Sequence, residues 1–453
     1  MFVPYALAFI GRRLWRQFDS LTFTPRATQE QWLMSLLRRN QDTLFGRTHS
    51  FGRIRSVEDY RASVQPADYE AVRPYVRAII EGRQRVLTAE APFMFNLTSG
   101  TTERPKLIPV TRSAAAMNAC LTTLWLYRTL VDHPDLLAGP FLFLAGAPVE
   151  GHTPGGLPYG AATGLALASA PWLLKRQHVI PGAVLEITDY DTKYYLTMRL
   201  ALEHRLSFIV TPNPGTLIRL AETADTRKEE MIRDIRDGTL SDCLDLGAAV
   251  LERVKGRLKP NARRASELAH CVEEYDALRP QDYWPELQVI GCWKGGSLGT
   301  QLTKLDRWFS PGTPVRDLGY LASEAHGSLP ISDSGADGVL ALDSNFYEFL
   351  PEEDRDKVNP HIVTCDELET GKTYYVLLTT PAGLYRYDIN DVVSVTGYYR
   401  NTPVIEFLRK GRSTSMPSSG FCAGTQISGL DSSSRSWSPV PTVRSRSIMQ
   451  PGC

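Results

Sequence analysis

The sequence predicts an α/β fold in which helices flank mixed sheets, with a β-rich subdomain near the C-terminal end. In the middle of the chain, apolar runs of strand length alternate with helical stretches, which is typical of α/β sheets. The runs are 141–145, 207–210 and 287–290, and the helical stretches are 195–204 and 217–224. Short strand-like segments separated by tight turns then indicate the β-rich part at about 335–408. These segments are 338–342, 374–380 and 392–398.

The chain opens with two helical patterns. The apolar stretch from Phe2 to Ile10 is too short to span a bilayer and precedes its arginines, so we expect a helix that docks on the protein. Peripheral contact of this stretch with a membrane is the alternative. Thr28 and Gln31 match a capping box, which predicts the start of an amphipathic helix that runs to Asn40.

The composition is that of an ordinary globular protein and argues against several classes of partner. Hydrophobic residues make up 43% of the 453, enough for a sizeable core, and 50 basic residues balance 50 acidic ones. No net field therefore recruits nucleic acid or an anionic membrane. The seven cysteines are scattered, which argues against a disulfide framework and a structural zinc site. We expect a cytoplasmic protein without nucleic-acid partners and without integral membrane association.

A loop between two short apolar segments has the composition of a phosphate-binding turn. Its hydroxyls and backbone N–H groups can surround anionic oxygens, while Lys106 supplies a neutralising charge. The loop residues are Thr98, Ser99, Gly100, Thr101 and Thr102. A predicted strand at 93–97 leads into the loop, and the apolar stretch 107–110 leads out of it. Because Pro105 precedes the lysine and no Ser or Thr follows it, the pattern excludes a Walker loop, and a solvated turn is the alternative.

Two acidic motifs in the C-terminal half have the chemistry to serve a nucleotide. Glu324, beside Ser323, can position a divalent metal on phosphate oxygens, and Tyr320 can stack on a flat ring. Asp391 precedes a strand-like segment, and a carboxylate in such a turn can accept hydrogen bonds from both hydroxyls of a ribose. The alternatives are a surface acid at a strand end for the first motif and a plain Asx turn for the second.

A glycine-rich stretch offers a rival hypothesis. The run from Gly295 to Gly299, with Ser297 at its centre, matches the nucleophile elbow of serine hydrolases, and Asp343 and His361 follow in a permissible order. An elbow places its serine directly after a strand, whereas residues 291–294 intervene here. The leading glycines can instead let the backbone lie flat against a planar ligand, as in the wall of an adenine or acyl pocket.

Taken in order, these segments resemble the acyl-acid amido synthetases first known as auxin-responsive promoter proteins, of the Gretchen Hagen three type, a branch of the adenylate-forming enzymes. The match resembles a bacterial member and covers roughly residues 25–412, including the stretches 43–46, 59–60 and 155–159. The resemblance implies the large N-terminal domain of adenylate-forming enzymes over 1–408, with mixed sheets flanked by helices.

The resemblance also implies roles for individual residues. Glu324 and Lys106 would be catalytic, with Glu324 acting near Mg²⁺ and the acyl phosphate. Tyr320 would contact the adenine, and Asp391 would hold the ribose. The phosphates of ATP would be bound by Thr98, Ser99, Gly100, Thr101, Thr102 and Lys106. The remaining wall of the nucleotide or acyl site would come from Gly295, Gly296, Ser297 and Ser323.

The implied reaction is an ATP-dependent ligation in two steps. A small-molecule carboxylic acid would attack the α-phosphate of ATP and expel pyrophosphate, and an amine or amino acid would then attack the acyl-AMP to give an amide. The first step concentrates negative charge on phosphorus, so lysine, magnesium and hydroxyl donors match its needs. The second needs proximity in a dry site. An acyl-CoA ligase and a non-catalytic nucleotide-binding scaffold are the alternatives.

The sequence departs from the family pattern near residue 412. The segment 407–412 resembles the hinge strand that leads to a small C-terminal domain, and we read 409–412 as a hinge remnant because no such domain follows. Residues 413–453 contain no lysine or glutamate and are rich in serine, which predicts disorder. We therefore expect a truncated or frameshifted member that binds nucleotide without efficient turnover.

Overall fold

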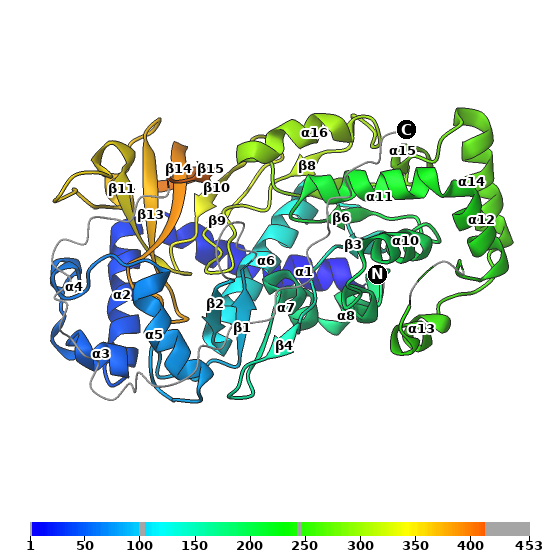
Figure 1. Ribbon diagram of the computed structural model, residues 1–453. Coiled ribbons are helices and arrows are strands. Elements are labelled where there is room, and N and C mark those ends of the chain that lie inside the picture. Colours follow the sequence, from blue (N-terminus) through cyan, green and yellow to red (C-terminus); the bar gives the residue numbers. More distant parts are fainter. Residues whose placement is uncertain (1, 99–104, 242–243, 245, 413–453) are drawn as a thin grey trace, which may run out of the picture.

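Three sheets organise the described part of the protein, and helices surround them (Figure 1). The structure is a computed structural model, and it describes residues 2–98, 105–241, 244 and 246–412. The mixed α/β architecture predicted from the sequence is confirmed. The sheet orders are β3-β6-β7-β8, β12-β11-β13-β14-β15-β10-β9 and β2-β1-β5-β4.

The first sheet is parallel and lies at the centre of the molecule. Its strands are β3 (Phe141–Phe143), β6 (Phe208–Val210), β7 (Val289–Gly291) and β8 (Val315–Arg316). The three predicted apolar runs therefore form neighbouring strands. The helices of this part are α7 (Ala162–Ser169), α8 (Trp172–Gln177), α9 (Gly182–Leu185), α10 (Tyr190–Ala201), α11 (Pro214–Thr226), α12 (Lys228–Asp237), α13 (Ala248–Lys255), α14 (Ala262–Tyr275), α15 (Pro280–Tyr283) and α16 (Gly299–Leu305).

The second sheet is antiparallel and confirms the predicted β-rich part. Its strands are β9 (Ser328–Leu329), β10 (Asp337–Leu340), β11 (Phe346–Pro351), β12 (Val363–Thr364), β13 (Thr373–Thr379), β14 (Tyr387–Tyr399) and β15 (Thr402–Lys410). Short 3-10 helices η3 (Glu352–Asp354) and η4 (Cys365–Glu367) connect some of them. The residues read as a hinge remnant begin within β15, since Asp391 pairs with Lys410 in the β14–β15 ladder.

The third sheet carries the predicted phosphate loop. Its strands are β1 (Met94–Leu97), β2 (Leu107–Val110), β4 (Gly151–His152) and β5 (Pro158–Gly160). β1 and β2 are antiparallel, so the segments predicted on either side of the loop form a hairpin.

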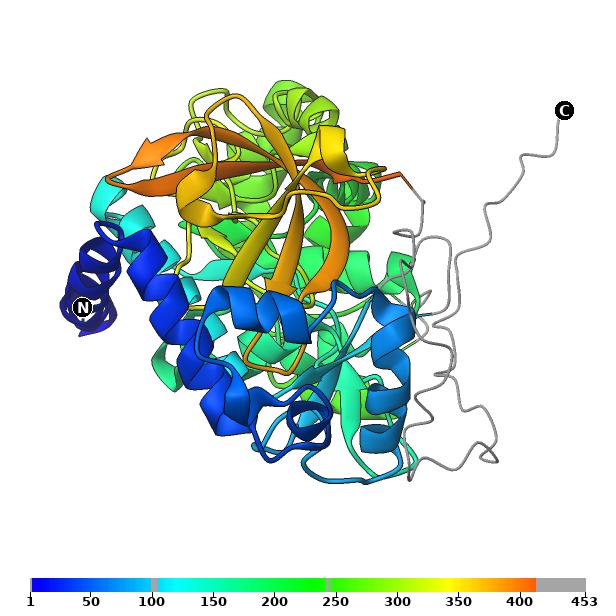
Figure 2. The same cartoon turned by 90° about the vertical axis from the view of Figure 1, so that its left-hand side faces the viewer.

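The N-terminal helices cover one side of the sheets (Figure 2). They are α1 (Phe2–Leu21), α2 (Pro25–Asn40), α3 (Leu44–Thr48), η1 (Phe51–Arg53), α4 (Val57–Ser63) and α5 (Tyr69–Ile80), followed by the long α6 (Arg112–Asp132). The docking expected for the first helix is confirmed, because α1 packs on α6 and buries Leu7 and Phe18. None of the helices in the described residues is long and apolar enough to cross a membrane.

The capping box predicted at Thr28 and Gln31 is wrong. The N-cap is Thr24, four residues earlier, and the Thr28 N–H already donates to the Thr24 carbonyl, 3.0 Å away, inside the first turn. Pro25 explains the earlier start, since its fixed φ and missing N–H suit the first position of a helix.

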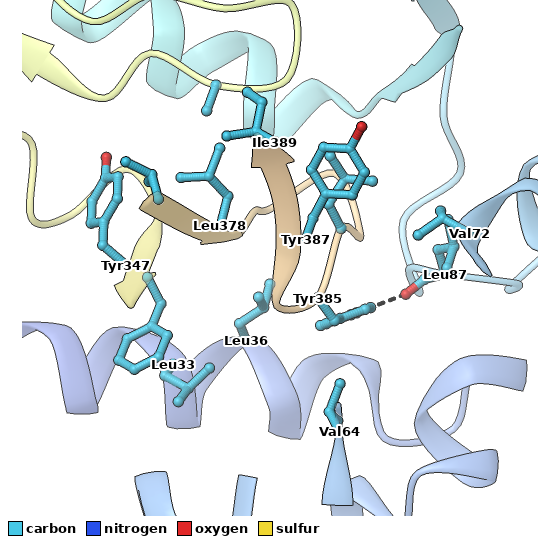
Figure 3. Close-up of a cluster of buried hydrophobic side chains, with 14 of the residues drawn as sticks. Leu33, Leu36, Val64, Val72, Leu87, Tyr347, Leu378, Tyr385, Tyr387 and Ile389 are labelled. Carbon is cyan, nitrogen blue, oxygen red and sulfur yellow. Dashed lines mark hydrogen bonds between the residues drawn. The ribbon is translucent and has the colours of Figure 1, made fainter. Parts of the chain in front are cut away.

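The largest apolar core joins α2 to the antiparallel sheet. Figure 3 shows Leu33 and Leu36 of α2 facing side chains of the sheet such as Tyr347 and Leu378, all of them buried. The hydroxyl of Tyr385 donates to the Leu87 carbonyl at 2.7 Å, which satisfies its polar atom inside this core.

A buried ion pair crosses the same region. Glu348 on β11 is 1% exposed, and its carboxylate accepts two hydrogen bonds from Arg386, at 2.8 and 3.0 Å. The guanidinium of Arg61 on α4 donates a third at 2.8 Å. Arg386 also donates to the Val64 carbonyl at 2.7 Å. These contacts fasten the N-terminal helices to the turn that precedes β14.

We predict that E348A lowers the free energy of unfolding by about 3–5 kcal/mol, because it leaves the Arg386 guanidinium buried without its carboxylate. Chemical unfolding measures the change. E369A is the matched control, since Glu369 is 62% exposed at its side chain and pairs with Lys372 at the surface. Equal losses of unfolding free energy in the two variants would show that the buried pair does not hold the N-terminal helices to the turn before β14.

Candidate functional site

The two described ends of the predicted phosphate loop, Thr98 and Lys106, are hydrogen-bonded to each other. The Thr98 N–H donates to the Lys106 carbonyl at 3.0 Å, and the Lys106 N–H donates to the Thr98 hydroxyl at 3.2 Å. The Lys106 ammonium lies 5.6 Å from the centre of the Tyr69 ring. The other predicted phosphate contacts, Ser99, Gly100, Thr101 and Thr102, lie outside the described residues. The hairpin thus fixes where the loop starts and where its lysine stands.

A tight turn carries the first acidic motif. The Ala322 N–H donates to the Ala325 carbonyl at 2.8 Å, so Ser323 and Glu324 occupy the tip of the turn. The Asn96 side chain on β1 donates to the Ser323 carbonyl at 2.9 Å. This bond holds the acidic turn beside the strand that leads into the phosphate loop.

The electrostatics of Glu324 show which charged groups surround it. Burial is the largest cause that raises the pKa of its carboxyl, and the Asp391 carboxylate raises this pKa further. The ammonium groups of Lys410 and Lys106 act in the opposite direction. Two carboxylates and two lysines from distant parts of the sequence therefore share one neighbourhood.

The second acidic motif is connected to the first through Tyr320. The Tyr320 hydroxyl donates to the Asp391 carboxylate at 2.9 Å, and the Lys410 ammonium lies 2.5 Å from the other carboxylate oxygen. Asp391 is 3% exposed, and burial raises its pKa while Lys410 lowers it. The Tyr320 ring is also buried and stacks on Phe407, with the ring centres 6.4 Å apart.

The expectation that Asp391 precedes a strand is wrong, because β14 begins at Tyr387 and contains it. The Asx turn belongs to Asp388, whose carboxylate accepts the Asn390 N–H at 2.9 Å, while Asn390 itself has a φ of +59°. Pairing of Asp391 with a residue of β15 keeps it inside the ladder. This long-range partner is absent from the local pattern that suggested a turn.

The glycine-rich stretch lies against the end of β15. A Cβ on Gly295 would stand 2.9 Å from the Phe407 carbonyl oxygen, and one on Gly296 would stand 2.9 Å from that of Leu408. Gly296 also has a φ of +61°, which other residues rarely adopt. The glycines are thus required for a close approach to β15, at the same Phe407 that stacks on Tyr320.

The hydrolase hypothesis finds no triad in the structure. Ser297 is exposed in the short helix η2 (Gly296–Leu298). Burial, and then the Asp343 carboxylate, raise the pKa of Cys120, which places Asp343 next to α6. His361 donates its backbone N–H to the carboxylate of a different residue, Asp354. The three predicted triad members therefore face different surroundings.

Three site residues escaped the sequence reasoning, namely Asn96, Phe407 and Lys410. Asn96 carries a local signal, since it is a polar residue inside a short apolar strand that leads into the loop. Phe407 and Lys410 were predicted only as parts of a hinge strand, because their contacts with the site come from the pairing of β15 with β14. Only the folded sheet brings Lys410 to Asp391.

Residues 14–315 match the GH3 family N-terminal domain, and residues 338–410 match the GH3 family central domain. A jasmonoyl–L-amino acid synthetase, GH3.5 of Oryza sativa subsp. japonica, is 25% identical over 431 residues, covering 86% of this chain and 71% of that protein. An indole-3-acetic acid-amido synthetase, GH3.3 of Arabidopsis thaliana, is 23% identical over 412 residues, covering 87% and 69%.

A solved structure shares the fold. AtGH3.15 acyl acid amido synthetase in complex with 2,4-DB superposes with a TM-score of 0.78 at 22% identity, covering 88% of this chain and 70% of that one. The family models match most of the chain, and they include β1, the acidic β14 and the start of the phosphate loop. The chain therefore belongs to the GH3 family, and the relatives named above are amido synthetases.

Proposed function

We propose that this chain activates a small carboxylic acid with ATP and joins it to an amine or amino acid. The observation that carries the proposal is the meeting of Lys106, Glu324, Asp391 and Lys410 around one turn. Anionic phosphates need positive groups, a ribose needs a carboxylate acceptor, and a metal needs a carboxylate ligand. The named activity of the rice relative supports an amino acid as acceptor, and that of the Arabidopsis relative supports an amide as product.

In the first step, an oxygen of the substrate carboxylate bonds to the α-phosphorus of ATP. The bond from that phosphorus to the bridging oxygen breaks, and pyrophosphate leaves with the electron pair. Lys106 stands at the mouth of the phosphate loop, where its charge stabilises the negative charge that develops on the phosphoryl oxygens. Tyr320 and the glycine-rich stretch border the adenine, and Asp391 accepts the ribose hydroxyls.

The residues present fit a magnesium ion that accompanies the nucleotide. Within the described ranges no group of three or more His, Cys, Asp or Glu side chains could hold a metal alone. Mg²⁺ in nucleotide sites is usually held by one or two carboxylates together with substrate phosphates, and Glu324 can be that carboxylate. When bound, the ion neutralises charge on the phosphate oxygens.

In the second step, the amine nitrogen bonds to the acyl carbon of the mixed anhydride. The bond from that carbon to the phosphate oxygen breaks, AMP leaves, and the amine releases a proton to solvent. The chain contributes mainly position in this step, because the acidic turn and the groups around it hold the anhydride next to the amine.

Carboxylate-dependent exchange of labelled pyrophosphate into ATP tests the proposal. We expect exchange with an indole- or jasmonate-type acid, and little without the acid. A protein that binds ATP yet never exchanges with any acid would be a nucleotide-binding scaffold instead.

We predict that K106A lowers the exchange rate by about 10²–10³, the usual cost of removing one preorganised group that stabilises developing charge. The fold should persist, since Lys106 lies at a hairpin mouth and its backbone bonds do not depend on its side chain. K372A is the matched control, because Lys372 is a surface lysine in the turn just before β13. Full activity in K106A would remove this lysine from the mechanism.

We also predict that D391N abolishes the preference for ATP over 2′-deoxy-ATP. The wild type should prefer ATP by roughly tenfold or more, because a hydrogen bond to a charged acceptor contributes about 1.5–3 kcal/mol. Competition of the two nucleotides in the exchange assay measures the ratio. Retention of the wild-type ratio in D391N would place the ribose elsewhere.

A further inference from the structure

Asp317 lies between two loops of the candidate site and bonds to both. It follows β8 and is 3% exposed. One carboxylate oxygen accepts the Lys294 N–H at 2.6 Å, and the other accepts the Gly319 N–H at 2.6 Å. Its backbone carbonyl accepts the indole N–H of Trp125 on α6 at 2.8 Å. The backbone of Asp317 is therefore bonded to α6, and its carboxylate uses both oxygens to hold the backbone of two neighbouring loops.

The two loops that Asp317 holds carry different walls of the site. The Lys294 backbone leads directly into Gly295, which lies against the Phe407 carbonyl of β15. The Gly319 backbone leads into Tyr320, whose N–H donates to the Ser328 hydroxyl at 2.9 Å. Phe407 and Tyr320 stack on each other, so any shift of one loop against the other changes this stack.

The backbone at Gly319 has a conformation and a close contact that only glycine permits. Its φ is +83°, and a Cβ at this position would stand 2.4 Å from the Ser328 carbonyl oxygen. The Asp317 carboxylate satisfies the backbone N–H of this glycine. The direction in which the chain enters Tyr320 therefore depends on that bond.

We propose that Asp317 is a positioning residue of the nucleotide site. It fixes the position of the glycine-rich loop relative to the Tyr320 loop. This inference rests on the proposed function, because it assigns the two loops to one nucleotide. Asp317 touches no substrate in this scheme, and it acts through Lys294 and Gly319.

The ionised Asp317 carboxylate does not add to the stability of the fold at neutral pH. Burial raises the pKa of Asp317 to about 6, although the two backbone N–H bonds and the Lys294 ammonium oppose the shift. Because this pKa lies above that of a free aspartate, ionisation of Asp317 costs folding free energy at neutral pH. Costly ionised groups of this kind concentrate at functional sites.

Acidification should affect the fold and the site in opposite directions. Protonation turns one acceptor oxygen into a donor, which removes one of the two backbone bonds and loosens the loops. It also removes the cost of the buried charge, so this group favours the fold as pH falls through about 6. The charged and titratable groups that interact with Asp317 are Lys294, Glu406 of β15 and Cys292.

The test compares D317N with wild type in ATP binding by calorimetry across pH. An asparagine side chain offers only one acceptor and turns its N–H₂ group toward the other backbone N–H. We expect D317N to weaken ATP binding by about tenfold at neutral pH, the effect of one lost charge-assisted bond. The extra weakening that wild type shows below pH about 6 should be absent from the variant, while the melting temperature changes little.

D234N is the matched control. Asp234 on α12 is also buried, and its two oxygens accept one bond each, from Tyr195 at 2.7 Å and Thr239 at 3.0 Å. It lies at the opposite end of the molecule from the antiparallel sheet (Figure 1). D234N should therefore keep the wild-type ATP affinity and pH profile whatever it does to stability.

One result would overturn the inference about Asp317, and a different result would overturn the proposed function. Equal affinities and pH profiles for D317N and wild type would reject Asp317 as a positioning residue and leave the nucleotide site intact. A wild type that fails to bind ATP would reject the proposed function itself. If D317N does not fold, amide hydrogen exchange in wild type decides, since protection of Lys294 and Gly319 should fall on acidification, and unchanged protection contradicts the proposal.

Discussion

The bidentate ion pair between Arg386 and Glu348 is the interaction on which the site most depends. Arg386 has a φ of +46° and lies in the turn before β14, and its carbonyl accepts the Ala67 N–H at 3.1 Å. The Asp388 N–H donates back to the Ala67 carbonyl at 2.8 Å, so the turn is fixed to the N-terminal helices at two points. β14 can then leave the turn in only one register, and that register sets where Asp391 stands.

From this fixed turn, the geometry of the site follows through the sheets. β14 pairs with β15 and brings Lys410 to Asp391, while the hydroxyl of Tyr320 ties Asp391 to the acidic turn. Asn96 then connects that turn to the hairpin of the phosphate loop. The last two connections are single hydrogen bonds between segments far apart in the sequence. The site is therefore a property of the packed sheets, and a change in one strand register would separate its charges.

Local patterns predicted those parts of the molecule that local forces determine. Apolar runs became strands such as β6 and β7, because burial on both faces needs an unbroken apolar segment. The helix start at Thr28 was misplaced because Pro25 gave a stronger local signal than the capping pattern. Asp391 was assigned to a turn, and Asp317 was passed over, because their roles depend on partners in other segments. No local pattern records such partners.

The charge balance of the site gives a reason for the metal in the proposed reaction. At rest, Glu324 and Asp391 face Lys106 and Lys410, so two carboxylates are matched by two ammonium groups. A nucleotide adds several negative charges to this balanced set, and burial has already raised the pKa of both carboxyls. Binding of ATP alone would push Glu324 further toward its neutral form. A divalent cation entering with the phosphates reverses that effect, so metal and nucleotide should bind cooperatively, and Glu324 is the residue that couples them.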